Sequence, residues 1–365
     1  MKNVLKLFTT PTFFACDNEV PASRGRCLIG PRVWALLLCA ISTFAPICVP
    51  LRAKPAASWT PIGPDAATVF CLVRDPFTSS RLYAGTYFGG LYRSDDDGAS
   101  WRIVPSPFSS FTIFSFAADP VVPGVLLVGT FGHGLYRSLD AGLTWEPVQG
   151  LEDSSPLDIA FVPSEPNSVL MATPTGVSRS SDGGVSWIAG NINPINLPAK
   201  CLACCPSQPG VMFVGTGGLG VYCSWDGGTN WASFANGLGQ AVVTGLAVDA
   251  QSGDVYASCY PGVFRLAAGA TSWENISFNL ASVNVNQVLA GPEAGVLAAT
   301  ESGTFVLQTN APMQWTLLTD KRSRLFLPGT VPGSYFLAEE TGTLWYTDDG
   351  FGLYATSITL YDPAV

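Results

Sequence analysis

The chain has 365 residues, 47% hydrophobic and only 12% charged, with 38 glycines and 28 prolines, a composition that suits many short strands joined by tight turns. From residue 55 onward, 11 lysines and arginines stand against 25 aspartates and glutamates, a net charge of −14. Because nucleic-acid binding requires a basic stripe, this acidic balance excludes nucleic acid as an expected partner.

Residues 1–54 differ from the rest of the chain and are interpreted as a leader. A net charge of +3 over residues 1–32 precedes an apolar run over residues 33–44, and Pro46 and Pro50 follow. The run is too short to span a bilayer comfortably but has the length of the apolar core of a secretory signal. We therefore expect an exported protein, secreted, periplasmic or at the cell surface. Since no small-x-small cleavage site follows, a retained signal anchor and a start assigned too early stay open, and the membrane is an expected partner only through this segment.

A tryptophan recurs every 42 to 44 residues along the remainder of the chain, which is interpreted as one repeat domain over residues 55–365. Seven tryptophans share this spacing: Trp59, Trp101, Trp145, Trp187, Trp231, Trp273 and Trp315. A period of this length indicates one supersecondary unit stacked many times.

Each repeat contains the pattern of four antiparallel strands. In the first copy, an alternating strand over 83–86, a glycine-rich turn over 87–90 and a strand over 91–94 form a hairpin signature. A further strand ends before Pro76, and a fourth begins at Trp101. Four such strands per repeat make a propeller blade. The sequence therefore predicts an all-β fold, a single seven-bladed β-propeller of four-stranded antiparallel blades, with six or eight blades as alternatives.

The two ends of the repeat array differ from its centre. Trp59 precedes the first complete copy, so its strand is expected to pair with the last blade and close the ring, which hides strand edges. Copies five and six keep the register but have Ala268 and Asn310 where the earlier copies have aspartate. Copy seven ends in Tyr354 in place of tryptophan.

Four of the tryptophans end the same phrase, Ser-x-Asp-x-Gly-x-(Ser/Thr/Asn)-Trp, which we name the Ser-Asp-Gly turn. Its members are Ser94, Asp96, Gly98 and Trp101; Ser138, Asp140, Gly142 and Trp145; Ser180, Asp182, Gly184 and Trp187; and Ser224, Asp226, Gly228 and Trp231. The aspartate can accept hydrogen bonds from the backbone of its own turn, the glycine permits a positive φ, and the tryptophan fills the space against neighbouring strands. We therefore expect a structural role for the four aspartates. The arginines before the phrase are expected to make blade-to-blade contacts: Arg93, Arg137, Arg179 and Arg265.

The phrase resembles the Asp-box, or BNR repeat, of sialidase-like propellers. Its extended form, Gly-Thr-x-x-x-Gly-(Leu/Val)-Tyr-Arg-Ser-x-Asp-x-Gly, is similar to repeats of bacterial single-propeller proteins, sortilin-type receptors, the photosystem II assembly factor of cyanobacteria and the two-propeller xyloglucanases. The resemblance covers residues 58–355. It implies that the Ser-Asp-Gly turns are structural and lie away from the ligand face.

Loops carry the function of propellers, so we seek the candidate site among them. If the strands run outward from the axis, the turns between second and third strands share one face with the blade-to-blade connections, opposite the Ser-Asp-Gly turns. The turns contribute Tyr87, Phe88, Phe131, His133, Tyr260, Glu301 and Glu340. The connections add Asp65, Phe108, Phe111, Glu152, Asp153, Lys200, Lys321, Arg322 and Arg324. Aromatic side chains mixed with a few charges suit a sugar or a peptide, although ordinary solvated loop tips have a similar composition.

No catalytic set of a known propeller enzyme is recognisable in the sequence. A sialidase needs an early Phe/Tyr-Arg-Ile-Pro motif, whereas residues 101–105 read Trp-Arg-Ile-Val-Pro. A glycosidase needs two carboxylates roughly 5–10 Å apart, and no spacing rule selects a pair among the acidic loop residues. His133 has no identifiable nucleophile to activate. Two carboxylates facing each other in a deep central pocket, one with a strongly raised pKa, would favour an enzyme.

We interpret the chain as an exported, non-catalytic Asp-box propeller that binds a protein or glycan through its loop-rich face. One alternative is a glycoside hydrolase or lyase, sialidase-like or xyloglucanase-like, with an unrecognised carboxylate pair. A second alternative is a membrane-tethered assembly factor or scaffold held by residues 33–44. No cofactor is expected, and the protein is expected to be a monomer.

The cysteines of the repeat domain allow two interpretations. The cluster Cys201-x-x-Cys204-Cys205 looks like a metal knuckle, but no second pair at ligand spacing exists and the only histidine, His133, is far away in sequence, so no metal is expected. Disulfides and buried apolar thiols stay open, with no pairing determined, for Cys71, Cys201, Cys204, Cys205, Cys223 and Cys259.

Overall fold

The computed structural model describes most of the repeat domain. The described residues are 60–64, 68–151, 154–163, 165–189, 191–192, 198–208, 210–280, 283–291, 295–308, 312–331 and 333–347. Two compact units, residues 1–52 and 53–365, divide the chain, and all described residues belong to the second. The expected leader lies outside the described residues, as do Trp59, Asp65, Glu152, Asp153, Asn310 and Tyr354. Within the described part of the chain, no helix has the length and apolar character needed to cross a membrane.

Seven antiparallel four-stranded sheets follow one another along the chain. Blade 1 is β2 (Val69–Arg74), β3 (Leu82–Thr86), β4 (Leu91–Ser94) and β5 (Arg102–Ile103); blade 2 is β6 (Ile113–Ala118), β7 (Leu126–Thr130), β8 (Leu135–Ser138) and β9 (Glu146–Pro147). Blade 3 is β10 (Asp158–Phe161), β11 (Val169–Thr173), β12 (Gly176–Ser180) and β13 (Ile188–Ala189); blade 4 is β15 (Ala199–Cys204), β16 (Met212–Thr216), β17 (Val221–Ser224) and β18 (Asn230–Ser233). The short β14 (Asn191–Ile192) adds to β18 in parallel.

The remaining blades follow the same pattern. Blade 5 is β19 (Val242–Val248), β20 (Val255–Tyr260), β21 (Val263–Leu266) and β22 (Glu274–Asn275), followed by the 3-10 turn η1 (Phe278–Leu280). Blade 6 is β23 (Val285–Gly291), β24 (Gly295–Thr300), β25 (Gly303–Gln308) and β26 (Gln314–Thr319). Blade 7 is β27 (Ser323–Pro328), β28 (Tyr335–Glu339), β29 (Leu344–Thr347) and, from the other end of the domain, β1 (Thr60–Pro61).

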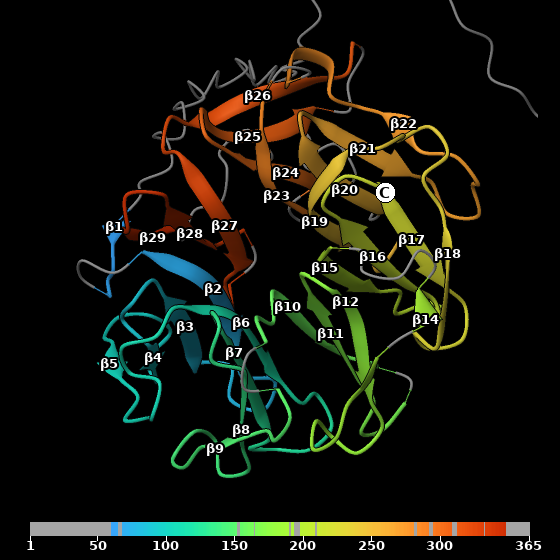
Figure 1. Cartoon of the computed structure of the whole chain (residues 1–365). Coiled ribbons are helices and arrows are strands. Elements are labelled where there is room, and N and C mark those ends of the chain that lie inside the picture. Colours follow the sequence, from blue (N-terminus) through green and yellow to red (C-terminus); the bar gives the residue numbers. More distant parts are fainter. Residues whose placement is uncertain are drawn as a thin grey trace, which may run out of the picture. The chain divides into compact units, whose positions relative to one another are not determined.

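The seven sheets are the blades of one propeller, which confirms the predicted fold (Figure 1). The first strand of each blade lies innermost. These strands contact one another in the circular order β2, β6, β10, β15, β19, β23, β27 and back to β2. The ring therefore encloses a central channel lined by seven first strands.

The N-terminal strand β1 closes the ring. Thr60 pairs with Tyr346 and Pro61 with Trp345, so β1 becomes the outermost strand of blade 7. The backbone N–H of Ile62 extends this pairing by donating to the carbonyl of Leu344 at 2.9 Å. The predicted closing strand is thus confirmed through the residues that follow Trp59.

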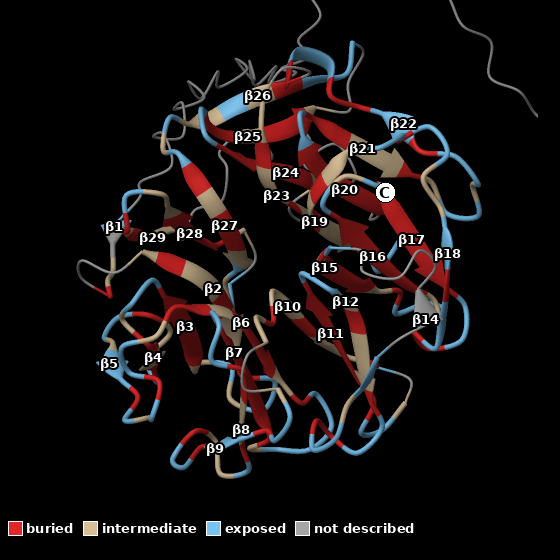
Figure 2. Cartoon of the chain, viewed as in Figure 1, coloured by how far each residue is buried: buried red, intermediate tan, exposed pale blue. Residues whose placement is uncertain are grey.

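The core lies between the blades rather than within any one of them. The second strands β3, β7, β11 and β16 are buried at every position, whereas the outermost strands β5, β9 and β22 are exposed (Figure 2). Each second strand is sandwiched between neighbouring blades, which explains its apolar residues on both faces. At the closing seam, for example, Leu82 of blade 1 packs with Phe336 and Leu344 of blade 7.

Hydrogen bonds within each Ser-Asp-Gly turn hold its backbone. In the second copy, the Ser138 hydroxyl donates to Asp140 at 2.8 Å and accepts the N–H of Gly142 at 2.9 Å. Asp140 accepts the hydroxyl of Thr144 at 2.6 Å and its N–H at 2.8 Å, and these bonds lower the pKa of Asp140 to about 2. Trp145 packs on the turn and donates to the carbonyl of Gly142 at 3.1 Å. Gly142 has a φ of 84°, the left-handed conformation that favours glycine.

The arginines before these turns connect neighbouring blades. Arg137 of blade 2 donates to the carbonyl of Gly183 at 2.8 Å, and Arg179 of blade 3 donates to that of Gly227 at 3.0 Å. Both carbonyls belong to the Ser-Asp-Gly turn of the next blade. Arg265 differs from the expectation, because it pairs with Asp254 of its own blade. The physical reason is that the next copy has no Ser-Asp-Gly turn to offer a carbonyl at that place.

Candidate functional site

The turns and connections expected to share a face do so. The N–H of Gly90, in the β3–β4 turn, donates to the carbonyl of Phe111 in the connection to blade 2 at 3.1 Å. The corresponding bonds in blades 4 and 5 join Gly220 to Ala241 at 3.2 Å and Gly262 to Val283 at 3.0 Å. We name this side of the propeller the loop face. The Ser-Asp-Gly turns lie at the opposite ends of the same strands.

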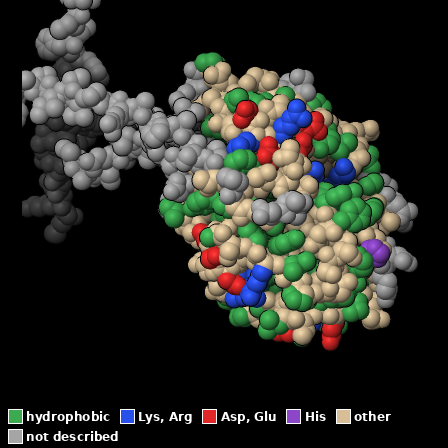
Figure 3. Space-filling view, turned by 90° about the vertical axis from the view of Figure 1, so that its left-hand side faces the viewer, with side chains coloured by type: hydrophobic (Ala, Val, Ile, Leu, Met, Phe, Trp, Pro, Cys, Tyr) green, Lys and Arg blue, Asp and Glu red, His purple; other side chains and the backbone are tan. Residues whose placement is uncertain are grey.

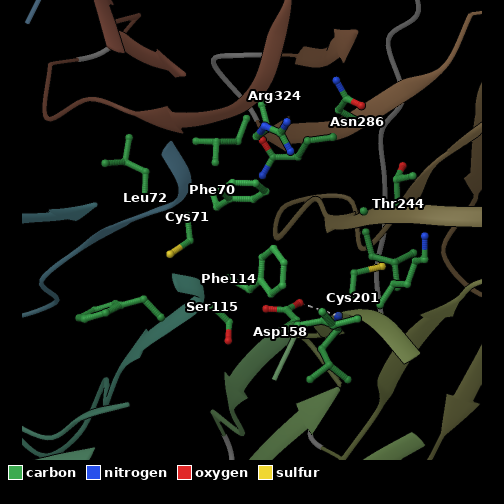
Figure 4. A pocket seen from close by; sticks show the side chains of 18 of the residues that line it. Phe70, Cys71, Leu72, Phe114, Ser115, Asp158, Cys201, Thr244, Asn286 and Arg324 are labelled. Atoms are coloured by element: carbon green, nitrogen blue, oxygen red, sulfur yellow. Dashed lines mark hydrogen bonds between the residues drawn. The ribbon is translucent and has the colours of Figure 1, made fainter. Parts of the chain in front are cut away.

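A β-bulge near the start of the first strands sets the geometry of the channel mouth. The ladder register shifts around the second residue of β2, β6, β15, β23 and β27 and around the third residue of β19. A bulge leaves one residue out of the ladder and redirects its side chain. The bulge residues, together with Leu157 at the corresponding place before β10, form what we name the mouth ring: Phe70, Phe114, Leu157, Lys200, Thr244, Asn286 and Arg324. All seven line a central cavity of about 480 Å³ (Figure 4).

The mouth ring is chemically divided. Blades 1 to 3 contribute Phe70, Phe114 and Leu157, whereas blades 4 to 7 contribute one amide, one hydroxyl and two cationic side chains. An apolar arc therefore faces a polar arc across the channel. Such a cavity suits a ligand that is itself apolar on one side and polar on the other.

The apolar arc continues onto the loop face as a band of five aromatic rings. The rings of Phe88, Tyr87, Phe70, Phe114 and Phe131 contact in this order, with centroids 4.4, 5.9, 5.3 and 5.4 Å apart. We name them the aromatic band. Tyr87, Phe88 and Phe131 are 54%, 62% and 57% exposed. Three of the expected ligand-face residues are thus brought together, linked through two channel residues.

Phe88 is held in a backbone conformation that suits glycine. Its φ is 50°, and the equivalent turn positions in blades 2 and 4 are Gly132 and Gly218, with φ of 72° and 135°. A bulky residue in this region is strained by about 1–2 kcal/mol. The Phe88 N–H is anchored by the hydroxyl of Thr112 at 3.1 Å.

His133 lies beside the aromatic band. Its ring stacks on Phe111 with centroids 3.9 Å apart and an interplanar angle of 12°. The histidine is exposed, at one edge of the side view (Figure 3). Stacking on one ring face leaves the other face accessible, so His133 adds a further flat surface to the loop face.

Asn286 of the polar arc belongs to a hydrogen-bonded group that extends across blades 5 to 7. The Tyr260 hydroxyl donates to Asn286 Oδ1 at 2.9 Å, and Asn286 Nδ2 donates to Glu340 Oε1 at 3.2 Å. Burial raises the pKa of Tyr260, and the negative charge of Glu301 adds to this effect, while Arg324 opposes it. Glu301 and Glu340, both expected from sequence, therefore lie near enough to Tyr260 to affect its pKa.

Arg324 lies over the Phe70 ring of the aromatic band. Its guanidinium carbon is 4.5 Å from the centroid of Phe70, a cation–π arrangement visible in Figure 4. The Nε atom is buried and has no hydrogen-bond partner among the residues that the structure describes. Among the described residues, no carboxylate oxygen lies within 4 Å of the Arg324 guanidinium.

Asp158 is the one carboxylate among the described residues that line the channel. It accepts the N–H of Ile159 at 2.9 Å and, across the blade boundary, the N–H of Leu202 at 2.8 Å (Figure 4). Burial raises the pKa of Asp158 to about 6, although these two N–H groups oppose the shift. The channel lining thus supplies one half of the carboxylate arrangement that a glycosidase needs.

Three further residues were expected on the loop face, and the structure places them differently from one another. Phe108 is fully buried against Trp145 in the core between blades, so its assignment to the ligand face is wrong. Lys321 lies over the Trp345 ring at 3.3 Å, and Arg322 is exposed on the loop face, where its carbonyl accepts the N–H of Glu340. Phe108 was misplaced because its side chain packs inward against Tyr136 and Trp145, although its connection runs along the loop face.

The sequence reasoning missed the channel residue Asp158 and five of the seven mouth-ring residues: Phe70, Phe114, Leu157, Thr244 and Asn286. A usable signal was present. The mouth-ring residues of successive blades stand 38 to 44 positions apart, so they form one column of the repeat. The bulge that turns this column toward the axis is not recognisable from residue types.

The cysteines and metal-ligand candidates form no additional site in the described part of the chain. The six cysteines are free, and burial raises the pKa of the thiols of Cys71, Cys204, Cys223 and Cys259 to about 12. This favours the buried-thiol interpretation over disulfides. No group of three or more metal-binding side chains occurs among the residues described.

The chain was compared with known proteins. No protein-family model matches it, and no curated protein matches it. Among solved structures it is similar to an ancestral GH74 enzyme, with a TM-score of 0.64 and 20% identity over 80% of this chain and 46% of that one. It is also similar to YCF48 bound to D1 peptide (TM-score 0.62, 17% identity, 80% of this chain and 96% of that one). A third similar structure is the extracellular domain of the putative one component system BT4673 from B. thetaiotaomicron. Its TM-score is 0.65 and its identity 14%, over 80% of this chain and 40% of that one.

These structures share the fold at low sequence identity. The chain spans about half the length of the GH74 enzymes, covering 46% of the ancestral one and 53% of the xyloglucanase from Xanthomonas campestris. At identities of 20% or less, the similarity establishes a propeller of this type and leaves the activity to be argued from the site. The chain is therefore a seven-bladed β-propeller with an aromatic and cationic channel mouth.

Proposed function

We propose that the chain is an exported, non-catalytic propeller of the Asp-box type that binds a glycan or a protein on its loop face. The observation that carries the proposal is the aromatic band, with Phe88 held exposed in a strained conformation. Because strain of this kind persists where the surrounding structure maintains it for a task, an exposed ring at that cost points to a ligand. A contiguous exposed apolar patch points the same way.

The likenesses to solved structures are compatible with this role. YCF48 was solved bound to a peptide, one GH74 structure is named a xyloglucanase, and the BT4673 domain is named extracellular. Together with the apolar run over residues 33–44, these names support an exported protein whose ligand is a peptide or a sugar chain. The four Ser-Asp-Gly turns support the Asp-box assignment.

Removing the Phe88 ring tests the binding function. Wild-type protein is screened on an array of oligosaccharides and peptides, and the affinity of the strongest binder is measured by calorimetry. Phe88→Gly and Phe88→Ala are each expected to lower the affinity for this ligand by roughly fivefold to tenfold, since one aromatic contact contributes about 1 kcal/mol. Trp225→Ala is the control, because Trp225 is 58% exposed but lies on a Ser-Asp-Gly turn. Absence of any binder, or equal losses in all three variants, contradicts the proposal.

A glycoside hydrolase is the second candidate, because a carboxyl group with a pKa near 6 is suited to general acid catalysis. Among the described residues that line the channel, Asp158 alone provides such a group, and both its oxygens are engaged by backbone N–H groups. Wild-type and Asp158→Asn proteins should be assayed on polysaccharides and aryl glycosides. Turnover by the wild type that disappears in the variant favours the hydrolase; equal inactivity of both favours binding without catalysis.

A further inference from the structure

The basic residues of the repeat domain fall into two groups. Seven arginines donate to a carboxylate or carbonyl oxygen: Arg74, Arg81, Arg93, Arg102, Arg137, Arg179 and Arg265. The other four basic residues lie at the loop-face starts of first strands: Lys200 in β15, Arg324 in β27, and Lys321 and Arg322 just before β27. Figure 3 shows basic and acidic side chains next to each other on one side of the propeller, as in the first group. Arg324 differs from that group because it forms no ion pair with a described carboxylate.

Arg324 is positioned before any ligand arrives. The Phe70 ring supports its guanidinium at 4.5 Å, and Phe70 is itself fixed by the ring of Phe114 at 5.3 Å. The buried Nε has no acceptor in the described part of the molecule. Because Nε is buried, an oxygen ligand in the cavity would meet the terminal guanidinium nitrogens, which no described carboxylate approaches within 4 Å.

The surroundings of Arg324 favour an anion with a single charge. Asn286 and Tyr260 are neutral polar groups that line the same cavity and hydrogen-bond to each other, and Glu340 is hydrogen-bonded to Asn286. Glu301 also raises the pKa of Tyr260, so two carboxylates lie near this arc. A dianionic phosphate would meet more repulsion there than a carboxylate, which a guanidinium binds in a planar two-bonded fashion.

The remainder of the ligand is constrained by the strands of the channel. An extended peptide could add to a free strand edge, but the bulges disrupt the ladder of six first strands at the mouth. Recognition by side chains alone is left. Flat aromatic rings next to an arginine, an amide and hydroxyl groups suit a pyranose ring that carries a carboxylate.

We infer that the channel mouth binds an acidic oligosaccharide, with the carboxylate of a uronate on Arg324 and its sugar ring on the aromatic band. The inference rests on the proposed binding function and specifies its ligand class. Arg324 is the specificity-determining residue, because it distinguishes acidic from neutral sugars. Phe70 is a positioning residue that holds the guanidinium in place.

The experiment compares matched probes by calorimetry on the full chain at pH 7.5 and 0.15 M salt. The probes are tetragalacturonate and its neutral counterpart galactotetraose, with an acidic peptide of alternating Phe and Glu and its Gln counterpart as a second pair. Wild-type protein should bind tetragalacturonate at least about tenfold more tightly than galactotetraose, the effect of one charge-assisted interaction. Arg324→Gln should abolish this ratio by lowering the affinity for tetragalacturonate to about that for galactotetraose.

The control is Arg322→Gln, which removes the same charge from an exposed neighbour. It should keep the tenfold preference, and thermal unfolding should show all variants folded. Equal losses in both variants would indicate general electrostatic attraction and overturn the inference, as would a preference for the acidic peptide over tetragalacturonate. If both tetrasaccharides bind equally to wild type and lose affinity in Phe88→Gly, the carboxylate assignment fails while the binding function stands. If no probe binds and the array also yields no ligand, both fail.

Discussion

At the scale of single residues, the Ser-Asp-Gly turn is a self-contained unit. Asp182 accepts the hydroxyl of Ser186 at 2.6 Å and its N–H at 2.9 Å, and the Ser180 hydroxyl donates to it at 2.8 Å. Although burial opposes the shift, these bonds lower the pKa of Asp182 to about 2. The aspartate thus satisfies donors that the turn would otherwise leave to water.

Asp182→Ala is expected to destabilise the protein by about 1–2 kcal/mol, because hydrogen bonds to an ionised acceptor are lost. The pKa of Asp182 is depressed in the folded state, so its contribution is present above pH 4 and disappears as the pH falls through 2. Denaturant unfolding at pH 7 measures the difference. Glu146→Ala, at an exposed strand position, serves as the control and should be nearly neutral; equal effects would refute the structural role.

Asp158 gives the opposite pH dependence. Its folded-state pKa of about 6 exceeds the value of 3.8 expected in the unfolded chain. The folded protein therefore binds this proton more tightly, and the free energy of unfolding should fall as the pH rises from about 4 to 6, by at most about 3 kcal/mol. Denaturant titrations across this range should show a steeper fall for the wild type than for Asp158→Asn. Identical slopes would mean that Asp158 is solvated like an ordinary carboxyl.

At the scale of elements, later blades replace the Ser-Asp-Gly turn with contacts between blades. Trp145 and Trp231 donate to carbonyls within their own turns. Trp273 donates instead to the carbonyl of Phe234 at 2.8 Å, and Trp315 to that of Ile276 at 2.8 Å, both in the preceding blade. The tryptophan keeps its packing role while its hydrogen bond moves, which explains how copies five and six lose the phrase and keep the blade.

The exposed, strained position of Phe88 in the β3–β4 turn is expected to lower the stability of the protein. Phe88→Gly relieves the strain at a φ of 50°, which offsets the entropy that glycine adds to the unfolded chain, so stability should stay equal or rise by about 1 kcal/mol. Phe88→Ala loses the ring and keeps the strain. Thermal unfolding should therefore rank Phe88→Gly above Phe88→Ala. The reverse order would show that the left-handed conformation is not strained here.

At the scale of the whole molecule, ring closure depends on one short strand. β1 pairs with β29 across 286 positions of sequence, from Thr60 to Tyr346. This pairing joins the two ends of the repeat array and covers the edge of blade 7. It should contribute more to stability than its two residue pairs suggest, because opening it exposes the seam.

Truncation tests this role. A chain that begins at residue 64 lacks β1, whereas a chain that begins at residue 55 retains it. The shorter chain should unfold at a temperature lower by several degrees, since the loss of about 1–2 kcal/mol shifts the midpoint of a domain of this size by about 2–4 °C per kcal/mol. Calorimetry compares the two. Equal unfolding temperatures would mean that the ring closes through packing of β2 on β27 alone.

The repeat period was readable from the sequence because each copy is built from local patterns. The recurring tryptophan, the alternating strands and the glycine-rich turns each involve residues close together in the chain. They predicted the seven blades, the closing strand, the Ser-Asp-Gly turns and the shared loop face. They also predicted the loop-face positions of Tyr87, Phe88 and Phe131, whose role in binding stays a prediction.

The channel mouth was decided only by tertiary structure. Phe70 and Arg324 are 254 positions apart, and they meet because blade 7 lies next to blade 1 once the ring has closed. A bulge, which residue types do not reveal, turns their column of the repeat toward the axis. The raised pKa of Asp158 and the burial of Phe108 likewise depend on neighbouring blades. The sequence by itself therefore determined the architecture, because the architecture follows from short-range periodicity. The site depends on contacts between residues that only the closed ring brings together.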